Sequence, residues 1–219
     1  MKVGMDGVLL GAWADVSGAK RILDIGTGTG LIALMMAQRN ADARIDAVEI
    51  EPDAFQEAVS NIQQSPWNER IQIELCSFQK FVEKTDLKYD LIVSNPPYFT
   101  NGHKAPLENR ATARHSDSLP LSALISGAIG LLNEKGKIAL VLPIDGLPEL
   151  AQLADSNNLH ISRICHVKPN PQKQLFRILV ELTKSECIFQ EENLMIEFEK
   201  HHDYTPEYKE LTKEFYLKF

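Results

Sequence analysis

Short apolar runs alternate along the chain with longer amphipathic stretches. The runs predict strands at 21–25, 44–50, 71–75, 89–94 and 137–142, and the amphipathic stretches predict helices at 31–39, 52–64, 121–132 and 146–157. Strands that alternate with helices favour an α/β fold with a mainly parallel sheet and helices on both faces. Two further strands, 160–167 and 175–183, are joined by a turn too short for a helical crossover. We therefore expect seven strands, with the last one antiparallel.

Two stretches do not follow this alternation. Residues 99–120 form a long polar segment after the fourth predicted strand, and loops of this length are usually functional or disordered. The segment 185–219 is acidic at first but ends with Phe215, Tyr216 and Phe219, which a purely disordered tail would not need. We therefore expect one domain over 1–219, with 185–219 as a C-terminal extension docked on it.

Composition narrows the class of protein. The 219 residues are 44% hydrophobic and 24% charged, which suits a globular domain with a sizeable core. The net charge of -7 argues against a chain that coats nucleic acid electrostatically, although a local basic face is compatible with it. Three distant cysteines, with no C-x-x-C pair, indicate reduced thiols in a cytoplasmic protein without a metal site. No signal peptide and no membrane-spanning stretch is expected.

A glycine-rich segment follows the first predicted strand and opens a helix. It places glycines at 26, 28 and 30, with Thr27 between the first two, and Leu31 stands where a dinucleotide-binding fingerprint would have its last glycine. Asp24 precedes the loop, where its carboxylate can accept from a ligand directly or through water. Glu49 and Ile50 end the next strand, and an acid at that place can take both hydroxyls of a ribose.

Together these residues resemble the first two motifs of the Rossmann-like methyltransferases. The resemblance implies that Asp24, Gly26, Thr27, Gly28, Gly30, Glu49 and Ile50 bind S-adenosyl-L-methionine. After the third strand the family often has an acid that accepts from the adenine amine, but here the chain has Ser77 and Phe78. Ser77 can accept a hydrogen bond more weakly. Phe78 can pack on the adenine or can be a core residue, and the sequence leaves both interpretations open.

The segment Asn95-Pro96-Pro97-Tyr98 directly follows the fourth strand. Two prolines stiffen the turn, so the Asn95 amide oxygen and the Pro96 carbonyl are presented as fixed acceptors for an NH2 group. Two acceptors favour a pyramidal nitrogen with an exposed lone pair, and Tyr98 offers a face on which a planar substrate stacks. This motif resembles that of amino-methyltransferases, which implies catalytic roles for Asn95, Pro96 and Tyr98 and a cofactor contact for Asn95.

Each end of the chain carries a motif that fewer enzymes share than share the two central motifs. These terminal motifs are Lys2 to Trp13 and Tyr204 to Phe219. With the two central motifs, they make the chain similar to bacterial tRNA (adenine-N6) methyltransferases, which modify an adenine beside the anticodon of a valine tRNA. The resemblance implies that residues 1–20 cover the cofactor, shortened here relative to the family, and that Asp6 touches its methionine end. A capping role for Asp6 is the alternative. We expect a monomer with a tRNA substrate.

The charges are unevenly distributed. Residues 156–180 hold Lys168 and Lys173 and no acid, and 99–120 holds Lys104, Arg110 and Arg114, whereas acids concentrate in 186–214. These basic residues are candidates for tRNA contact, since phosphate contacts position a substrate. Four alternatives remain open: a release-factor glutamine methyltransferase, an enzyme for ribosomal RNA or DNA amines, a non-catalytic S-adenosylmethionine-binding protein, and a nicotinamide-dependent oxidoreductase. The glycine spacing disfavours the last.

Overall fold

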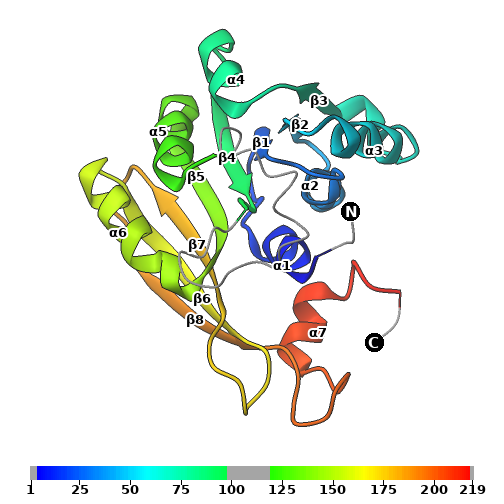
Figure 1. Cartoon of the computed structure of the whole chain (residues 1–219), viewed down its shortest axis with the longest axis vertical. Helices are drawn as coiled ribbons and strands as arrows, with labels where there is room; N and C mark the ends of the chain where they lie inside the picture. Colours follow the sequence, from blue (N-terminus) through cyan, green and yellow to red (C-terminus); the bar gives the residue numbers. More distant parts are fainter. Residues whose placement is uncertain (1–3, 98–118, 218–219) are drawn as a thin grey trace, which may run out of the picture.

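A computed structural model describes residues 4–97 and 119–217. Its eight strands form one sheet in the order β3-β2-β1-β4-β5-β7-β6-β8 (Figure 1). The strands are β1 Arg21–Ile25, β2 Arg44–Glu49, β3 Ile71–Leu75, β4 Tyr89–Ser94, β5 Leu132–Pro143, β6 His160–Lys168, β7 Arg177–Thr183 and β8 Gln190–Met195. Only β7 runs against its neighbours, β5 and β6. The mainly parallel sheet with an antiparallel seventh strand is therefore confirmed, and β8 adds a strand that the sequence analysis missed.

Helices cover both faces of the sheet. The described helices are α1 Met5–Trp13, α2 Leu31–Arg39, α3 Pro52–Gln63, α4 Phe78–Lys84, α5 Leu121–Leu131, α6 Leu147–Ser156 and α7 Pro206–Thr212. Successive strand residues point to opposite faces, so Ile22 packs with α1, α2, α3 and α7, while Leu23 packs with α4, α5 and α6. The two resulting cores hold the sheet rigid from both sides.

Helix α1 was not predicted because it is buried almost all round. Seven of its nine residues are buried, so no polar stripe marks the helical period. It runs along the sheet against β5 and β7, with α2 and α7 beside it (Figure 1). Gly11 permits the close approach to α2, since a Cβ there would lie 2.5 Å from the sulfur of Met35.

The C-terminal segment packs into the same core as α1. Thr205 caps α7 by accepting from the Tyr208 backbone N–H, and the Tyr208 side chain is 1% exposed. Leu211 and Phe215 pack on a small cluster that contains Val8 of α1. Within the described ranges, no helix has both the length and the apolar character that crossing a bilayer requires.

Candidate active site

The carboxyl ends of β1, β2 and β4 meet at one edge of the sheet. These three strands are parallel neighbours, and Ile25 lies beside both Val48 and Ser94. The chain therefore brings the glycine loop, Glu49 and Asn95 together, although they are spread over many residues of sequence. Clefts at the carboxyl edge of an open α/β sheet are the usual place for a ligand in this class of fold.

The glycine loop is pinned to β2 by its backbone. The N–H groups of Gly26 and Thr27 both donate to the Val48 carbonyl, at 2.9 and 3.0 Å. Gly26, Gly28 and Gly30 all have left-handed φ angles, of 68°, 60° and 83°, which only glycine adopts without strain. A Cβ built on Gly26 meets no described atom within 4 Å, whereas one on Gly30 would lie 3.4 Å from Ala58 of α3. Gly26 thus leaves open space, and Gly30 permits helix packing.

Asp24 is completely buried beneath the loop. Its Oδ2 accepts from the Thr27 hydroxyl at 2.6 Å and from the Ala33 N–H at 3.1 Å, while its Oδ1 has no hydrogen-bond partner among the described residues. Burial, aided by the nearby Glu49 carboxylate, raises the pKa of Asp24 to about 7, against the two hydrogen bonds. A buried acceptor without a partner is rare in proteins and marks this carboxyl as available to a ligand.

Glu49 turns back over the glycine loop. Its Oε2 accepts from the Gly28 N–H at 2.7 Å, and its Oε1 accepts from the N–H groups of Ile50 and Glu51, each at 2.8 Å. An ionised carboxylate has about four acceptor positions, so these three hydrogen bonds leave one. A ribose that used both of its hydroxyls would therefore have to replace one of these three hydrogen bonds. The Ile50 side chain is 39% exposed beside it.

The end of β4 is anchored before the Asn-Pro-Pro turn begins. The buried Ser94 hydroxyl donates to the Ile25 carbonyl at 2.8 Å, which ties β4 to β1 where the glycine loop starts. Asn95 follows half-buried, Pro96 is buried and Pro97 is exposed. The predicted acceptors therefore stand on a rigid strand end. Tyr98 lies outside the described residues.

The residues after β3 serve the fold in this structure. The Ser77 hydroxyl caps α4 by accepting from the Lys80 N–H at 3.3 Å. The Phe78 side chain is 5% exposed and packs so closely on α5 that a Cβ on Gly127 would lie 2.6 Å from its ring. Of the two interpretations that the sequence left open for Phe78, this placement favours the core residue. The predicted adenine contacts of Ser77 and Phe78 stay predictions.

Asp6 connects α1 to the start of β7. Its Oδ2 accepts from the Arg177 Nε at 2.8 Å, and both side chains are partly buried. Because β7 is antiparallel, Arg177 lies at the same edge of the sheet as the glycine loop. Asp6 is thus close to the expected cofactor edge, but one of its oxygens is held by a cation. No sequence pattern predicts this partner, which is 171 positions away.

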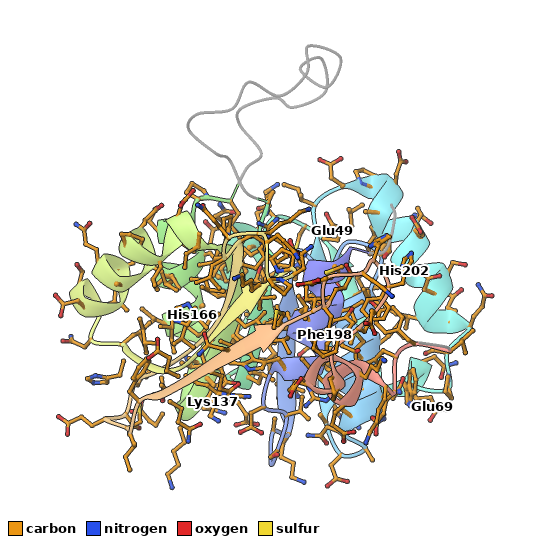
Figure 2. All side chains as sticks on the ribbon, turned by 90° about the horizontal axis from the view of Figure 1, so that it is seen from below. Glu49, Glu69, Lys137, His166, Phe198 and His202 are labelled. Atoms are coloured by element: carbon orange, nitrogen blue, oxygen red, sulfur yellow. The ribbon has the colours of Figure 1, made fainter. Side chains whose placement is uncertain are left out.

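Two of the predicted basic residues lie at this same edge. Lys168 ends β6, and Lys173 is exposed in the turn between β6 and β7. The other three candidates, Lys104, Arg110 and Arg114, lie outside the described residues. A cleft of about 590 Å³ opens instead at the opposite edge, where Lys137 is ion-paired with Asp15. Figure 2 shows Glu49 and Lys137 at opposite ends of the sheet, so this cleft is remote from the predicted chemistry.

Comparison with known proteins agrees with these observations. Residues 8–145 match the family model "Methyltransferase small domain". The chain is similar over its whole length to proteins named tRNA1(Val) (adenine(37)-N6)-methyltransferase. It is 46% identical to the one from Trichodesmium erythraeum, covering 92% of that protein, and 47% identical to the one from Bacteroides fragilis, also covering 92%.

Solved structures share the fold at low sequence identity. A predicted O-methyltransferase from Agrobacterium tumefaciens superposes with a TM-score of 0.74 at 20% identity, over 95% of this chain and 96% of that one. TrmK of M. capricolum, solved with the natural cofactor product S-adenosyl-homocysteine, gives 0.59 at 14% identity over 87% and 71%. The Rossmann-like methyltransferase fold that the sequence predicts is thereby confirmed.

Proposed function

The chain belongs to the tRNA1(Val) (adenine(37)-N6)-methyltransferase family, and we infer that it transfers a methyl group from S-adenosyl-L-methionine to the N6 amine of an adenine in tRNA. The observation that carries this proposal is the meeting of three groups at one sheet edge. Asp24, Glu49 and Asn95 come from β1, β2 and the end of β4, which are adjacent strands. The edge thus combines acceptors for a cofactor with an acceptor for an amine.

The residues of this edge fit S-adenosyl-L-methionine. The partnerless Oδ1 of Asp24 suits the ammonium group of the methionine part, reached directly or through water. The open space at Gly26 admits a ligand against the loop backbone, and Glu49 stands where a ribose would be held. When bound, this cofactor supplies a methyl group on a positively charged sulfur, which is open to attack by a nitrogen lone pair.

The protein's task is then to position the amine and to expose its lone pair. We propose that the Asn95 side-chain oxygen and the Pro96 carbonyl accept the two hydrogens of the adenine amine, since both groups follow a strand end that Ser94 anchors. Tyr98 is proposed to stack on the base. The methylated nitrogen then releases its extra proton to water, so no strong general base is required. Catalysis rests on orientation and on fixed dipoles.

The basic residues at the carboxyl edge are proposed to contact tRNA phosphates. Lys168 and Lys173 extend from β6 and its turn at the edge where the base would enter. A target base in an anticodon loop must be turned out of its stack to reach Asn95. Phosphate contacts of this kind hold the loop in register without reading its sequence. We further propose that the enzyme acts as a monomer in the cytoplasm, and light scattering with and without tRNA tests the monomer.

One assay tests the proposed reaction. The protein is incubated with labelled S-adenosyl-L-methionine and, in separate reactions, with unmodified tRNA, ribosomal RNA and a release factor. Each acceptor is then digested and the product is identified by mass spectrometry. We expect N6-methyladenosine in tRNA alone. Label in a glutamine or in ribosomal RNA would contradict the proposed substrate, and no label in any acceptor would contradict the proposed activity.

A further inference from the structure

A short turn joins β8 to α7, on a part of the molecule that the proposed reaction does not use. Glu197 and Tyr204 form an isolated bridge at its base, and the Phe198 N–H donates to the Asp203 carbonyl at 2.8 Å across it. His202 lies at the tip with a φ of 67°, in the left-handed region that a residue with a side chain rarely adopts. Figure 2 shows His202 and Phe198 on this C-terminal part of the chain.

The turn gathers three potential metal ligands. His201 Nδ1 lies 3.2 Å from Glu197 Oε1, and the rings of His201 and His202 are 3.8 Å apart between centroids. The His202 N–H donates to Glu197 Oε1 at 3.0 Å. One ligand atom from each of these three residues can be chosen so that all lie within 4.8 Å of one another. Among the described residues, Glu197, His201 and His202 are the one group of three His, Cys, Asp or Glu side chains placed so that they could hold a metal ion.

We propose that Glu197, His201 and His202 form a binding site for a divalent transition-metal ion, with Zn²⁺ as the representative ion. Imidazole nitrogens and a carboxylate oxygen are established zinc ligands, at about 2.0–2.2 Å from the metal. Tetrahedral ligands at that distance are about 3.3 Å apart, so ligand atoms that lie within 4.8 Å of one another must approach by up to about 1.5 Å. If His202 bound through Nδ1, the ion would replace the contact of that atom with the Tyr204 hydroxyl at 3.1 Å. The His201 side chain is 78% exposed, and its ring contacts are to His202 and Glu197, the other two proposed ligands. Water completes the coordination.

The surrounding charges favour a cation over an anion. Residues 197–207 contain four acids, Glu197, Glu199, Asp203 and Glu207, against one base, Lys200. The same negative charge argues against a nucleic-acid contact at this turn.

A bound ion would stabilise the turn that connects β8 to α7. Thr205 caps α7, and its hydroxyl also donates to the Met195 carbonyl at the end of β8. This hydrogen bond holds the start of α7 against the end of β8, so the turn between them forms a closed loop. An ion held by Glu197 and the two histidines would fix this closed form. Since Tyr208 is buried in the core, we expect the ion to protect α7 from local unfolding. The proposed site is thus structural: it acts on the packing of α7 and contributes no group to the cofactor or the amine.

Zinc binding tests the proposal directly. The starting protein for this experiment carries Cys187→Ser, because Cys187 is an exposed thiol and a thiolate is a zinc ligand that could compete with the proposed site. ZnCl2 is titrated in competition with a chromogenic chelator, and hydrogen exchange over 196–217 is followed by mass spectrometry. We expect one ion per chain, slower exchange in α7, and about tenfold or greater weakening of binding in a His201→Gln/His202→Gln variant.

Glu199→Gln is the matched control, because it removes a charge from the same turn without removing a ligand. We expect its zinc affinity to stay within about twofold of the starting protein. Two results overturn the proposal. One is a failure of the starting protein to take up zinc at one ion per chain. The other is equal zinc affinity in the starting protein and in the double histidine variant. Neither result bears on methyl transfer, which the tRNA assay tests separately.

Discussion

Replacing Asp24 with asparagine keeps the shape of a buried side chain, but the amide cannot gain or lose a proton as the carboxyl does. Burial raises the pKa of Asp24 from 3.8 to about 7 in the folded protein. The folded chain therefore keeps this proton over a pH range in which the unfolded chain has lost it. Stability linked to Asp24 falls as the pH rises from about 4 to about 7, and it stays at its lowest value above that range. The full loss amounts to about 4 kcal/mol.

The difference between two proteins isolates this effect from all other titrating groups. The free energy of unfolding of the unmodified protein, called the parent below, and of Asp24→Asn is measured in urea at several pH values. Between pH 5 and pH 8 we expect the difference to move by about 3 kcal/mol in favour of the variant. Both the Thr27 hydroxyl and the Ala33 N–H donate to Oδ2, so an asparagine with its oxygen in that place keeps both hydrogen bonds. Its NH2 group then replaces Oδ1, and burying it there adds an offset that does not depend on pH. A difference that is constant from pH 5 to pH 8 would refute the reasoning.

The same titration predicts how the cofactor binds. If the Asp24 carboxylate faces an ammonium group, binding must remove its proton. The affinity of the parent for S-adenosyl-L-methionine should then rise between pH 6 and pH 8, by about tenfold for a pKa near 7. Asp24→Asn should bind more weakly and should show a flatter pH profile. Calorimetric titration at each pH measures both, and parallel profiles for the two proteins would remove Asp24 from the cofactor site.

Three other predictions test separate parts of the structure. Asn95→Ala should lower turnover on tRNA by about 100-fold or more while cofactor affinity, measured by calorimetry, changes little; unchanged turnover would contradict its role. A double-mutant cycle with Asp6→Asn and Arg177→Gln should give a coupling of about 1 kcal/mol in urea unfolding, because the pair is partly buried; additive effects would show that the contact does not stabilise α1. Gly127→Ala should destabilise the protein by about 1–3 kcal/mol, since its Cβ would lie 2.6 Å from the ring of Phe78. The Cβ of Gly130→Ala would meet no described atom within 4 Å, so this variant should be neutral or slightly stabilising. Similar midpoints for the two glycine variants would contradict this difference.

The predictable part of the fold is the part with a clear hydrophobic period. The sequence predicts β1, β3, β4 and α2 with the bounds that the structure has, because each is a short apolar run or an amphipathic stretch between turn residues. It misses α1, whose burial on all sides erases the period. It also misses β8, whose sequence Gln190–Met195 is mostly polar. The pairing with β6, not intrinsic preference, makes that segment a strand.

The same distinction applies to the site. That Asp24, Glu49 and Asn95 lie at one edge follows from the rule that parallel strands have their carboxyl ends on the same side. Whether a given oxygen is already occupied does not follow from any pattern. The Thr27 hydroxyl proves to be engaged with Asp24, and one Glu49 oxygen with Gly28. These bonds depend on loop geometry at the level of tenths of an ångström, which residue types do not encode.

Helix α1, near the N-terminus, packs against the C-terminal segment and also reaches the edge of the sheet that carries the glycine loop. From Gly7 to Trp13 it is apolar and buried, so it is stable in this position only if these residues are covered. The sheet and α2 cover two sides, and α7 covers another through Leu211. The C-terminal segment is therefore part of what keeps α1 in place, and α1 carries Asp6 to the edge where the glycine loop begins. For this reason we expect the distinctive motifs at both termini to act together, although neither contributes an acceptor for the amine.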